Sequence, residues 1–536
     1  MRYVSLSAVA AALVAPSLLA AQQPAAERAT DSGRPAWMTV WSPLAPIAEH
    51  PRRLPRSPGL PELLLAPSPR VGLFWTAGNP AALASDVTER RNELRLSGGW
   101  DDGRYHRPLD PEEVSAVQFS GLGWQPLGRR GAAAGRVMVD QEMLGMASFA
   151  DIAEPHTSSP LVLSDSSLPE MRRVRVRLEG ALGWRFGGWG LGVATGVEVR
   201  DHRTQHVRFP RVGRLSAQGV ALGLMRELPL VRLRLAAYGR WLGGSERITL
   251  VAYPSPGLAY QLDGYNEPDR REVAQPYFRR IERDAWSLGL GLGGELWGAP
   301  WTIFGERTSR DDAHSSERRT HPATDRWSAK GWVLGGAIQR PLFGDRLVVT
   351  AQARYSRLRG SATRFDLQGD IFRSQESVLH ASADLRYTSP PWTAAALFSL
   401  GREKRTRHDY IVRVYSDIES WTPGLGLEVA RAVGPATTAS LGLALSAYSA
   451  TSIIPNPEAL GPVYNLLIAP ELALYATRAV PLTAALAVRH RLGEATAIYV
   501  RALRESLEPS GSEYTELAPS GERTLWSMAL GVVVGP

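Results

Sequence analysis

The chain has 536 residues, of which 44% are hydrophobic and 21% charged, and it carries a formal net charge of +8 without a cysteine. The absence of cysteine excludes a disulfide framework, a thiolate metal site and a cysteine nucleophile, and it removes the anchoring residue of a lipoprotein. Arginine supplies the positive charge, since Lys330 and Lys404 are the only lysines. The arginines alternate with apolar residues instead of clustering on one face, so we do not expect nucleic-acid binding.

Residues 1–21 have the layout of a secretory signal peptide. One charged residue, Arg2, is followed by an apolar run from Ala8 to Leu19 and then by small residues. About a dozen apolar residues are too few to cross a bilayer as a helix, and the alternative to a signal is a buried helix. No later stretch has about twenty uninterrupted apolar residues. We therefore expect a secreted chain that is either a large soluble β protein or an outer-membrane barrel.

Residues 22–88 are expected to form a proline-rich periplasmic tail. Proline at this density prevents strand pairing and helix continuation. Near its end, Val71–Ala84 is apolar enough to need burial, and Gly-Asn-Pro interrupts it as a strand. We expect this stretch to form a small plug in the lumen or against the periplasmic rim. The region before Asn92 is too short and too proline-rich for the folded plug domain of a TonB-dependent transporter.

The clearest strand signal is Met171–Val193. Val174, Val176 and Leu178 share one parity, and arginines occupy the positions between them. A strand has a period of two residues, so one face is apolar and the other is charged. Hairpins of this kind recur along most of the chain, which predicts apolar faces toward lipid and charged faces toward a lumen.

Two classes of connection alternate after a first strand at Asn92–Trp100. Short turns rich in Gly, Pro and Asp end strand pairing, and long polar connections lie between them. The short turns fall near Gly128, Gly187, Pro229, Ala299, Phe343, Pro390, Gly434 and Pro481; the long connections include Thr308–Arg326, Arg357–Glu376, Arg402–Glu419, Thr451–Pro462 and Gly493–Arg523. The longest connection, Gly243–Asp284, has room for an extra hairpin. With a last strand at Thr524–Val534, this spacing predicts an all-β fold, a transmembrane antiparallel barrel of about 18 strands at residues 89–536.

Aromatic residues support the orientation of this barrel. Several tryptophans stand beside the short turns, where a periplasmic girdle is expected to anchor in the membrane interface. They are Trp124, Trp184, Trp189, Trp297, Trp301 and Trp392, joined by Phe343. We place the protein in the outer membrane, after export by its signal peptide, with both termini on the periplasmic side.

Three stretches carry a family resemblance. They are G-N-P-A-A-L-A at 78–84, G-G-W-D-D-G-R-Y-H-R-P-L-D-P-E-E-V-S at 98–115 and V-R-V-R-L-E-G at 174–180. They resemble the outer-membrane β-barrel family filed as domain of unknown function 6850. The resemblance implies a signal peptide, an early Asn-Pro-Ala element and a single barrel, and it implies no catalytic residue. The strand count also resembles that of capsule-anchoring outer-membrane lectins, without a match of residues.

The lumen parity collects charged side chains from several strands. The candidates are Arg173, Arg175, Arg177, Glu179, Arg232, Arg234, Glu295, Arg354, Asp384 and Arg386. They form either a pore lining that favours anions or a closed network of arginine–carboxylate pairs. The cluster of three consecutive lumen-facing arginines opposes no equally dense acidic stripe, which predicts anion preference if a pore exists.

Catalysis and metal binding are minor hypotheses for this chain. His380, Ser382 and Asp384 share one parity, but on one strand they point the same way, about 7 Å apart for every two residues, and do not converge as a triad requires. His202 with His206, and Asp311 and Asp312 with His314, fall in predicted loops and could hold a metal only weakly. We expect no enzyme, cofactor or metal site.

Two functions remain open: a passive channel, and a closed barrel that serves as a structural, surface-anchoring or glycan-binding protein. An outer-membrane hydrolase is the third choice. The expected partners are outer-membrane lipid and either anionic small solutes or surface glycans.

Overall fold

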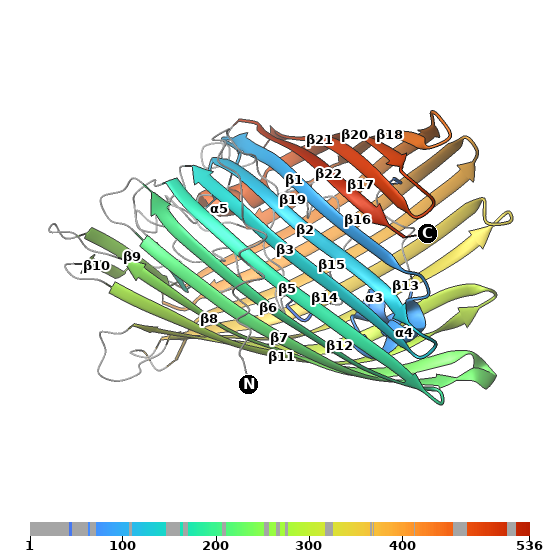
Figure 1. Cartoon of the computed structure of the whole chain (residues 1–536). Coiled ribbons are helices and arrows are strands. Elements are labelled where there is room, and N and C mark those ends of the chain that lie inside the picture. The colour runs from blue at the N-terminus through green and yellow to red at the C-terminus, as the bar shows by residue number, and fades with distance from the viewer. Residues whose placement is uncertain are drawn as a thin grey trace, which may run out of the picture.

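The computed structural model describes most of the chain from residue 71 onward and a few residues before it. The described residues are 42–44, 60, 63–64, 71–106, 110–145, 161–164, 170–205, 211–250, 257–263, 269–273, 277–316, 325–364, 367, 369–411, 413–453, 469–511 and 521–535. The predicted signal peptide at 1–21 lies outside them. The described residues form a closed antiparallel barrel (Figure 1), which confirms the predicted fold class.

The barrel wall is one sheet in which each strand pairs with its neighbours in the chain, and β1 (Arg91–Gly103) pairs with β22 (Arg523–Val534) to close the ring. In the described part of the chain this sheet has 19 strands, but β18 (Thr437–Ser446) and β19 (Ser449–Ile453) both pair with β17 (Val414–Ala432). They are two pieces of one stave, so the described wall has 18 staves, as predicted.

The other staves follow in chain order. They are β2 (Glu113–Leu127), β3 (Gly131–Gly145), β5 (Glu170–Phe186), β6 (Trp189–Gln205), β7 (Arg211–Leu228), β8 (Leu233–Leu250), β11 (Tyr277–Leu296), β12 (Ala299–Ser316), β13 (Asp325–Leu342), β14 (Leu347–Arg364), β15 (Gly369–Ser389), β16 (Trp392–Asp409), β20 (Arg478–Arg491) and β21 (Thr496–Gly511).

Many staves are much longer than a membrane requires. From β11 to β17 they have 18 to 21 residues, whereas about 9–11 residues cross a bilayer. The expected long loops at Thr308–Arg326 and Arg402–Glu419 are therefore mostly strand. Polar composition was the wrong criterion there, because a strand that has left the membrane is solvated on its outer face.

The predicted tight turn at Pro481 is also wrong. Pro481 lies inside β20, and the chain turns instead between Arg491 and Thr496. At Pro481 the neighbouring stave is interrupted at residues 447–448, and pairing with β18 begins only at Leu482. Proline lacks an N–H donor, and it is tolerated where the strand ladder is broken. The number of tight turns is the same as predicted, so the predicted strand count is still correct.

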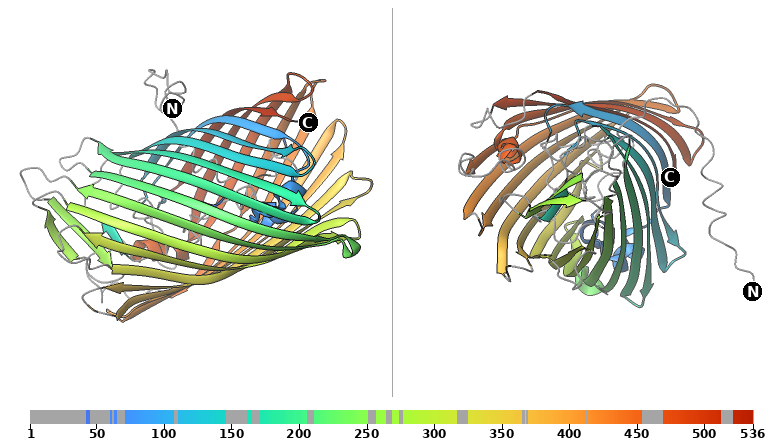
Figure 2. Two further views of the ribbon diagram at one scale, coloured as in Figure 1. Left: turned by 60° about the horizontal axis from the view of Figure 1, so that its bottom comes forward. Right: turned by 90° about the vertical axis from the view of Figure 1, so that its left-hand side faces the viewer.

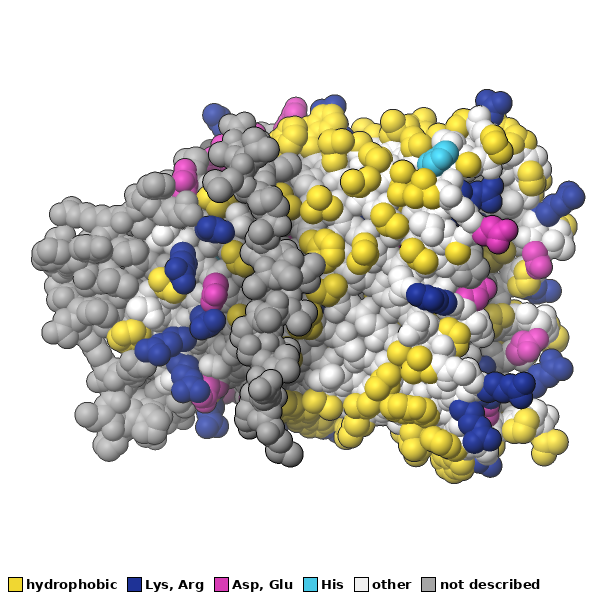
Figure 3. Space-filling model, viewed as in Figure 1, with side chains coloured by type: hydrophobic (Ala, Val, Ile, Leu, Met, Phe, Trp, Pro, Cys, Tyr) yellow, Lys and Arg dark blue, Asp and Glu magenta, His cyan; other side chains and the backbone are white. Residues whose placement is uncertain are grey.

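The outer face of the wall is an apolar band between two sets of aromatic side chains. Trp184, Trp189, Trp297, Phe343 and Trp392 are exposed beside the tight turns, and a second set lies toward the long connections: Trp100, Trp241, Trp286, Trp332, Trp421 and Trp526. On β11, about 11 residues separate Trp286 from Trp297; at ~3.3 Å per residue and a tilt of ~40°, this spans roughly 28 Å, close to the apolar height of an outer-membrane barrel. Hydrophobic side chains cover the middle of the wall and charged ones lie toward both ends (Figure 3).

One tryptophan departs from this pattern. Trp124 was expected in the girdle, but it is only 3% exposed and faces the lumen. Its ring meets that of Trp75 edge to face, with centroids 5.2 Å apart.

Three short helices fill the tight-turn end of the lumen. They are α3 (Leu73–Ala77), the 3₁₀ helix η2 (Pro80–Ala82) and α4 (Leu83–Asp86), and they lie inside the ring of strands (Figure 2). Leu73, Phe74 and Leu83 are at most 1% exposed and belong to one apolar cluster with lumen-facing alanines of β3 and β5–β8.

The described residues of the proline-rich segment, 42–44, 60 and 63–64, also lie in the lumen. Leu44 packs against Leu242 and Ala285, Leu60 against lumen-facing residues of β18 and β20–β22, and Leu64 against those of β17 and β20–β22. Proline prevents strand pairing, but it does not prevent an extended segment from burying its leucines against a barrel wall.

Two further elements lie at the long-connection end (Figure 1). The connection between β8 and β11 contains the hairpin β9 (Gly257–Asp263) and β10 (Asp269–Val273), and β4 (Leu161–Ser164) pairs with β9. The helix α5 (Ala469–Ala476) packs against β17 and β19. Within the described residues, no helix is both long and apolar enough to cross a membrane.

Candidate functional site

The lumen is the candidate functional site, and glycines on its wall determine where the inserted segment lies. Gly183 on β5, Gly192 on β6 and Gly223 on β7 all face inward, and a Cβ atom at any of them would overlap residues 79–84. At Gly192 the overlap would be with the backbone of Pro80. Only glycine lets the two backbones approach so closely, so β5–β7 form a docking surface for the inserted segment.

Asp86 holds the inserted helices together and ties them to the wall. One carboxylate oxygen accepts the Phe74 N–H at 2.8 Å, and the other accepts from Arg234 Nη1 on β8 at 2.9 Å. Burial raises the pKa of Asp86 to about 6, against the opposing effect of Arg234. A second tie joins Ser85 Oγ to the Glu227 carboxylate on β7 at 2.9 Å.

The predicted arginine cluster on β5 is neutralised by neighbouring strands. Arg173 pairs with Glu142 at 3.1 Å and Arg175 with Asp140 at 2.9 Å, both on β3. Arg177 contacts Glu179 at 2.9 Å on its own strand and Glu198 of β6 at 3.6 Å. The expectation that no acidic stripe opposes these arginines is therefore wrong.

Sequence reasoning missed this acidic stripe although its signal was present. Asp140 and Glu142 share one parity on β3, and antiparallel pairing places them opposite Arg175 and Arg173. The alternation rule applied to Met171–Val193 would have shown the same inward parity on β3. Only the register between β3 and β5 could not be predicted from the sequence.

The inserted segment takes part in this network. The Ser42 hydroxyl donates to Glu179 and accepts from Arg177 Nη2, and Ser42 is fully buried. Arg136 on β3 also donates to Glu179, at 3.2 Å. The charged wall thus bonds the inserted segment at Ser42, and the glycines of β5–β7 admit its backbone at Pro80.

A second buried network lies above α3. Glu306 on β12 accepts from Arg240 on β8 and from the Tyr238 hydroxyl, the latter at 2.9 Å. Arg354 on β14 faces the same group, 5.9 Å from the Phe304 ring centre. In the helix, Thr76 Oγ1 is 3.0 Å from Thr302 Oγ1 of β12.

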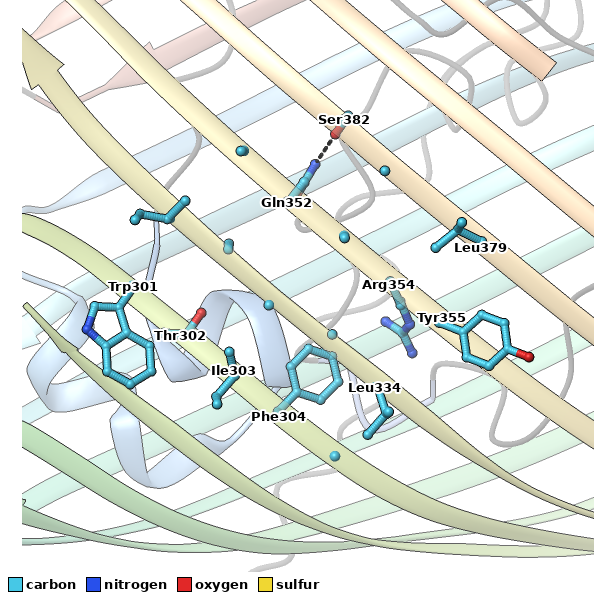
Figure 4. A pocket seen from close by; sticks show the side chains of 18 of the residues that line it. Trp301, Thr302, Ile303, Phe304, Leu334, Gln352, Arg354, Tyr355, Leu379 and Ser382 are labelled. Atoms are coloured by element: carbon cyan, nitrogen blue, oxygen red, sulfur yellow. Dashed lines mark hydrogen bonds between the residues drawn. The ribbon is translucent and has the colours of Figure 1, made fainter. Parts of the chain in front are cut away.

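The lumen wall from β14 to β16 is different. The side chains of Gln352, Ser382 and Ser399 are half-buried, and His380 is exposed, although all four face the lumen. Gln352 Nε2 donates to Ser382 Oγ at 3.0 Å (Figure 4). Solvent therefore reaches the middle of this wall.

His380, Ser382 and Asp384 do not form a catalytic triad. They lie side by side on the lumen face of β15, as expected for alternating positions. Ser382 bonds Gln352, and Asp384 accepts from Arg386 Nε at 2.9 Å. Asp384 and Arg386 thus form a buried pair instead of lining a free charged surface.

Two predicted lumen residues lie at the rim instead. Arg232 ends the turn η3 (Pro229–Val231) with a left-handed backbone, and its side chain is 74% exposed. It lies 3.6 Å from Glu295, which is 45% exposed, at the end of β11. Parity was correct for both, but the strands end before the lumen is enclosed.

The candidate metal residues do not converge. Asp312 and His314 face inward on β12 and contact Arg310 and Arg279, whereas Asp311 faces outward and accepts from Ser328. They lie in a strand, not in the predicted loop, because β12 extends to Ser316. His202 is buried in β6, and His206 lies outside the described residues. No group of three or more His, Cys, Asp or Glu in the described part of the chain is placed to bind a metal.

Residues 80–534 match the Family of unknown function (DUF6850). The chain belongs to this family. The match covers nearly the whole barrel, which confirms the resemblance seen in the early motifs. The match begins at Pro80, so it includes the helices η2 and α4 of the docked segment together with the barrel.

Solved structures of similar fold include the copper transporter OprC, with a TM-score of 0.39, 9% identity and coverage of 83% of this chain and 80% of that one. The ferric yersiniabactin uptake receptor FyuA from Yersinia pestis has a TM-score of 0.39, 8% identity and coverage of 84% and 80%. Likeness at this level carries no argument about cargo. None of the curated proteins matches the sequence.

Proposed function

We propose that this DUF6850 protein is a passive outer-membrane pore whose solutes pass along the β14–β16 side of the lumen, beside the docked N-terminal segment. The supporting observation is the solvent exposure of that wall. His380 is exposed and Ser382 half-buried, whereas Glu179 across the lumen is buried and bonded to Ser42 of the inserted segment. A polar, wetted wall in a barrel of this size is what a diffusion pathway requires.

Export by the predicted signal peptide at 1–21 and a non-enzymatic role belong to the same proposal. Two polar groups of β15 are already bonded: Ser382 to Gln352 and Asp384 to Arg386. A nucleophile or a general base would need these groups free. The passage needs no cofactor. Its cargo would be small solutes, with anions as the first class to test.

Conductance in a planar bilayer tests the pore directly, using the full chain. We expect discrete openings, and we expect Ser382→Trp to lower the conductance by more than half because the indole enters the passage. The matched control is Leu385→Trp on the same strand, whose side chain faces outward. Equal conductance of the two variants, or a channel that responds only to Leu385→Trp, contradicts a passage along this wall.

A closed surface-binding barrel is the second candidate. It is favoured by the insertion of residues 42–44, 60, 63–64 and 71–87 into the lumen, which narrows the passage from two sides. This candidate, with a surface glycan as partner, predicts no openings in the unmodified protein. Openings that appear only after Gly192→Val, which displaces the docked segment, would support it over the pore.

A further inference from the structure

The outer wall of the barrel carries an open apolar groove over β12–β15 (Figure 4). Its volume is about 1350 Å³, larger than the ~300–1,000 Å³ of most ligand pockets. Small and bulky outward residues line it together. The small ones include Gly305, Gly336, Ala351, Ala353, Ala381 and Ala383, and the bulky ones include Leu290, Ile303, Leu334, Ile338, Phe398 and Leu400.

The upper end of the groove, toward the long connections, is marked by an aromatic pair. The rings of Trp332 and Tyr355 lie with centroids 5.0 Å apart. Trp332 belongs to the aromatic set that marks the outer interface of the membrane, so this end of the groove lies in the outer leaflet. Its lining is almost wholly hydrocarbon, which suits an acyl chain.

Four outward-facing cations lie beside this pair or one step above it. Arg307 and Arg357 are the cross-strand neighbours of Trp332 on either side, and Lys330 is the neighbour of Arg359 one step farther out. Arg307, Lys330 and Arg359 are exposed, and Arg357 is half-buried. The strand register therefore gathers four positive charges at the height where lipid head groups begin.

Within the described residues, none of these four cations forms an ion pair, and Arg357 donates instead to the Gln375 side chain at 3.1 Å. The neighbouring outward acid, Asp311, accepts from Ser328. The next outward cations around the wall are different. Arg402 and Lys404 on β16 pair with Glu419 and Asp417 on β17 at 2.7 and 3.3 Å.

We propose that this surface binds a phosphorylated lipid of the outer leaflet. The acyl chains lie in the groove between Ile303 and Leu334, and the phosphate groups lie on Arg307, Lys330, Arg357 and Arg359. Arginine binds phosphate oxygens through two parallel N–H donors, and lysine adds a point charge. The site depends on the membrane location of the barrel and is independent of the pore.

A second copy of this chain is the competing occupant. Small residues between bulky ridges also suit close packing of two walls. A two-fold dimer, however, would bring each cluster of four unpaired cations toward its own copy, and like charges across an interface cost several kcal/mol. Charge complementarity thus favours an anionic lipid.

Native mass spectrometry of the full chain in detergent tests the site with bisphosphorylated lipid A as the probe and its monophosphorylated form as the comparison ligand. We expect the bisphosphorylated form to bind at least tenfold tighter. The triple variant Arg307→Gln/Lys330→Gln/Arg359→Gln is expected to lose that preference. The control Arg402→Gln/Lys404→Gln removes cations that already have acidic partners, and it should keep the preference.

The groove is tested separately by filling it. Ala353→Trp is expected to weaken lipid A binding at least fivefold, whereas Ala394→Trp, an outward position on β16 outside the groove, should not. Both variants place an indole on a lipid-facing wall, so neither is expected to prevent folding. Equal binding by the cation triple variant and its control, or a dimer that Ala353→Trp converts to monomer without change in lipid binding, overturns the proposal.

Discussion

The two sides of the lumen follow the same alternation of inward and outward residues, yet the inserted segment covers only one of them. On β5–β8 the inward positions hold paired charges and glycines, and the inserted segment covers them. On β14–β16 the inward positions include uncovered amides and hydroxyls such as Gln352 and Ser382. The difference teaches that the inward charges on the covered side act as a contact surface, because Glu179 and Asp86 each bond partners within the chain.

Breaking a buried pair on the covered side should have the largest effect. Arg175→Gln removes the partner of Asp140, and loss of one partner of a buried ion pair costs ~3–5 kcal/mol. Thermal unfolding in detergent, followed by the mobility shift of the unfolded barrel, measures this loss. Arg280→Gln is the control, since Arg280 and Glu282 are each 57% exposed and such pairs contribute about 1 kcal/mol or less. Similar shifts for both would mean that the network does not carry the stability of this wall.

Filling the glycine docking surface should have the next largest effect. Gly192→Val places a side chain where the Pro80 backbone lies, and overpacking of this kind costs ~1–3 kcal/mol. We expect residues 71–87 to become sensitive to protease while the barrel stays intact. Gly180→Val on β5 is the control, because a Cβ there meets nothing within 4 Å. Protection of residues 71–87 in Gly192→Val would refute close docking.

The smallest effect expected is a pH dependence of docking through Asp86. Its pKa in the docked state is about 6 against an ordinary 3.8, so the docked state holds the proton more tightly than the undocked state does. Docking is then strongest below about pH 4 and weakens as pH rises through 6, by an amount on the order of 3 kcal/mol at most.

A nitroxide label on Ala84→Cys in the cysteine-free chain reports this change as increasing mobility between pH 4.5 and 7.5. Asp86→Asn should flatten the pH profile, since it leaves nothing to titrate. If the mobility of the label rises with pH to the same extent in Asp86→Asn, a group other than Asp86 causes the pH dependence.

Much of the fold followed from the sequence because strand alternation is local. Val176 and Leu178 are 38% and 52% exposed, facing outward as the parity of Met171–Val193 predicts, and Arg175 is buried on the inner face. The spacing of tight turns gave 18 strands even though Pro481 was misplaced as a turn. These signals depend on a few neighbouring residues, so a single sequence contains them.

The candidate site depended on contacts between residues far apart in the chain. Ser42 meets Glu179, Leu60 meets Ala444, and Leu63 N–H reaches Glu428 at 2.9 Å. No periodicity in a proline-rich segment indicates which wall it will touch. The sequence by itself determined a charged lumen and an apolar outer face, because both follow from a period of two. Only the tertiary structure decided which charges are neutralised, which wall is covered and where cations lie above an apolar groove, because strand register and chain insertion set those neighbours.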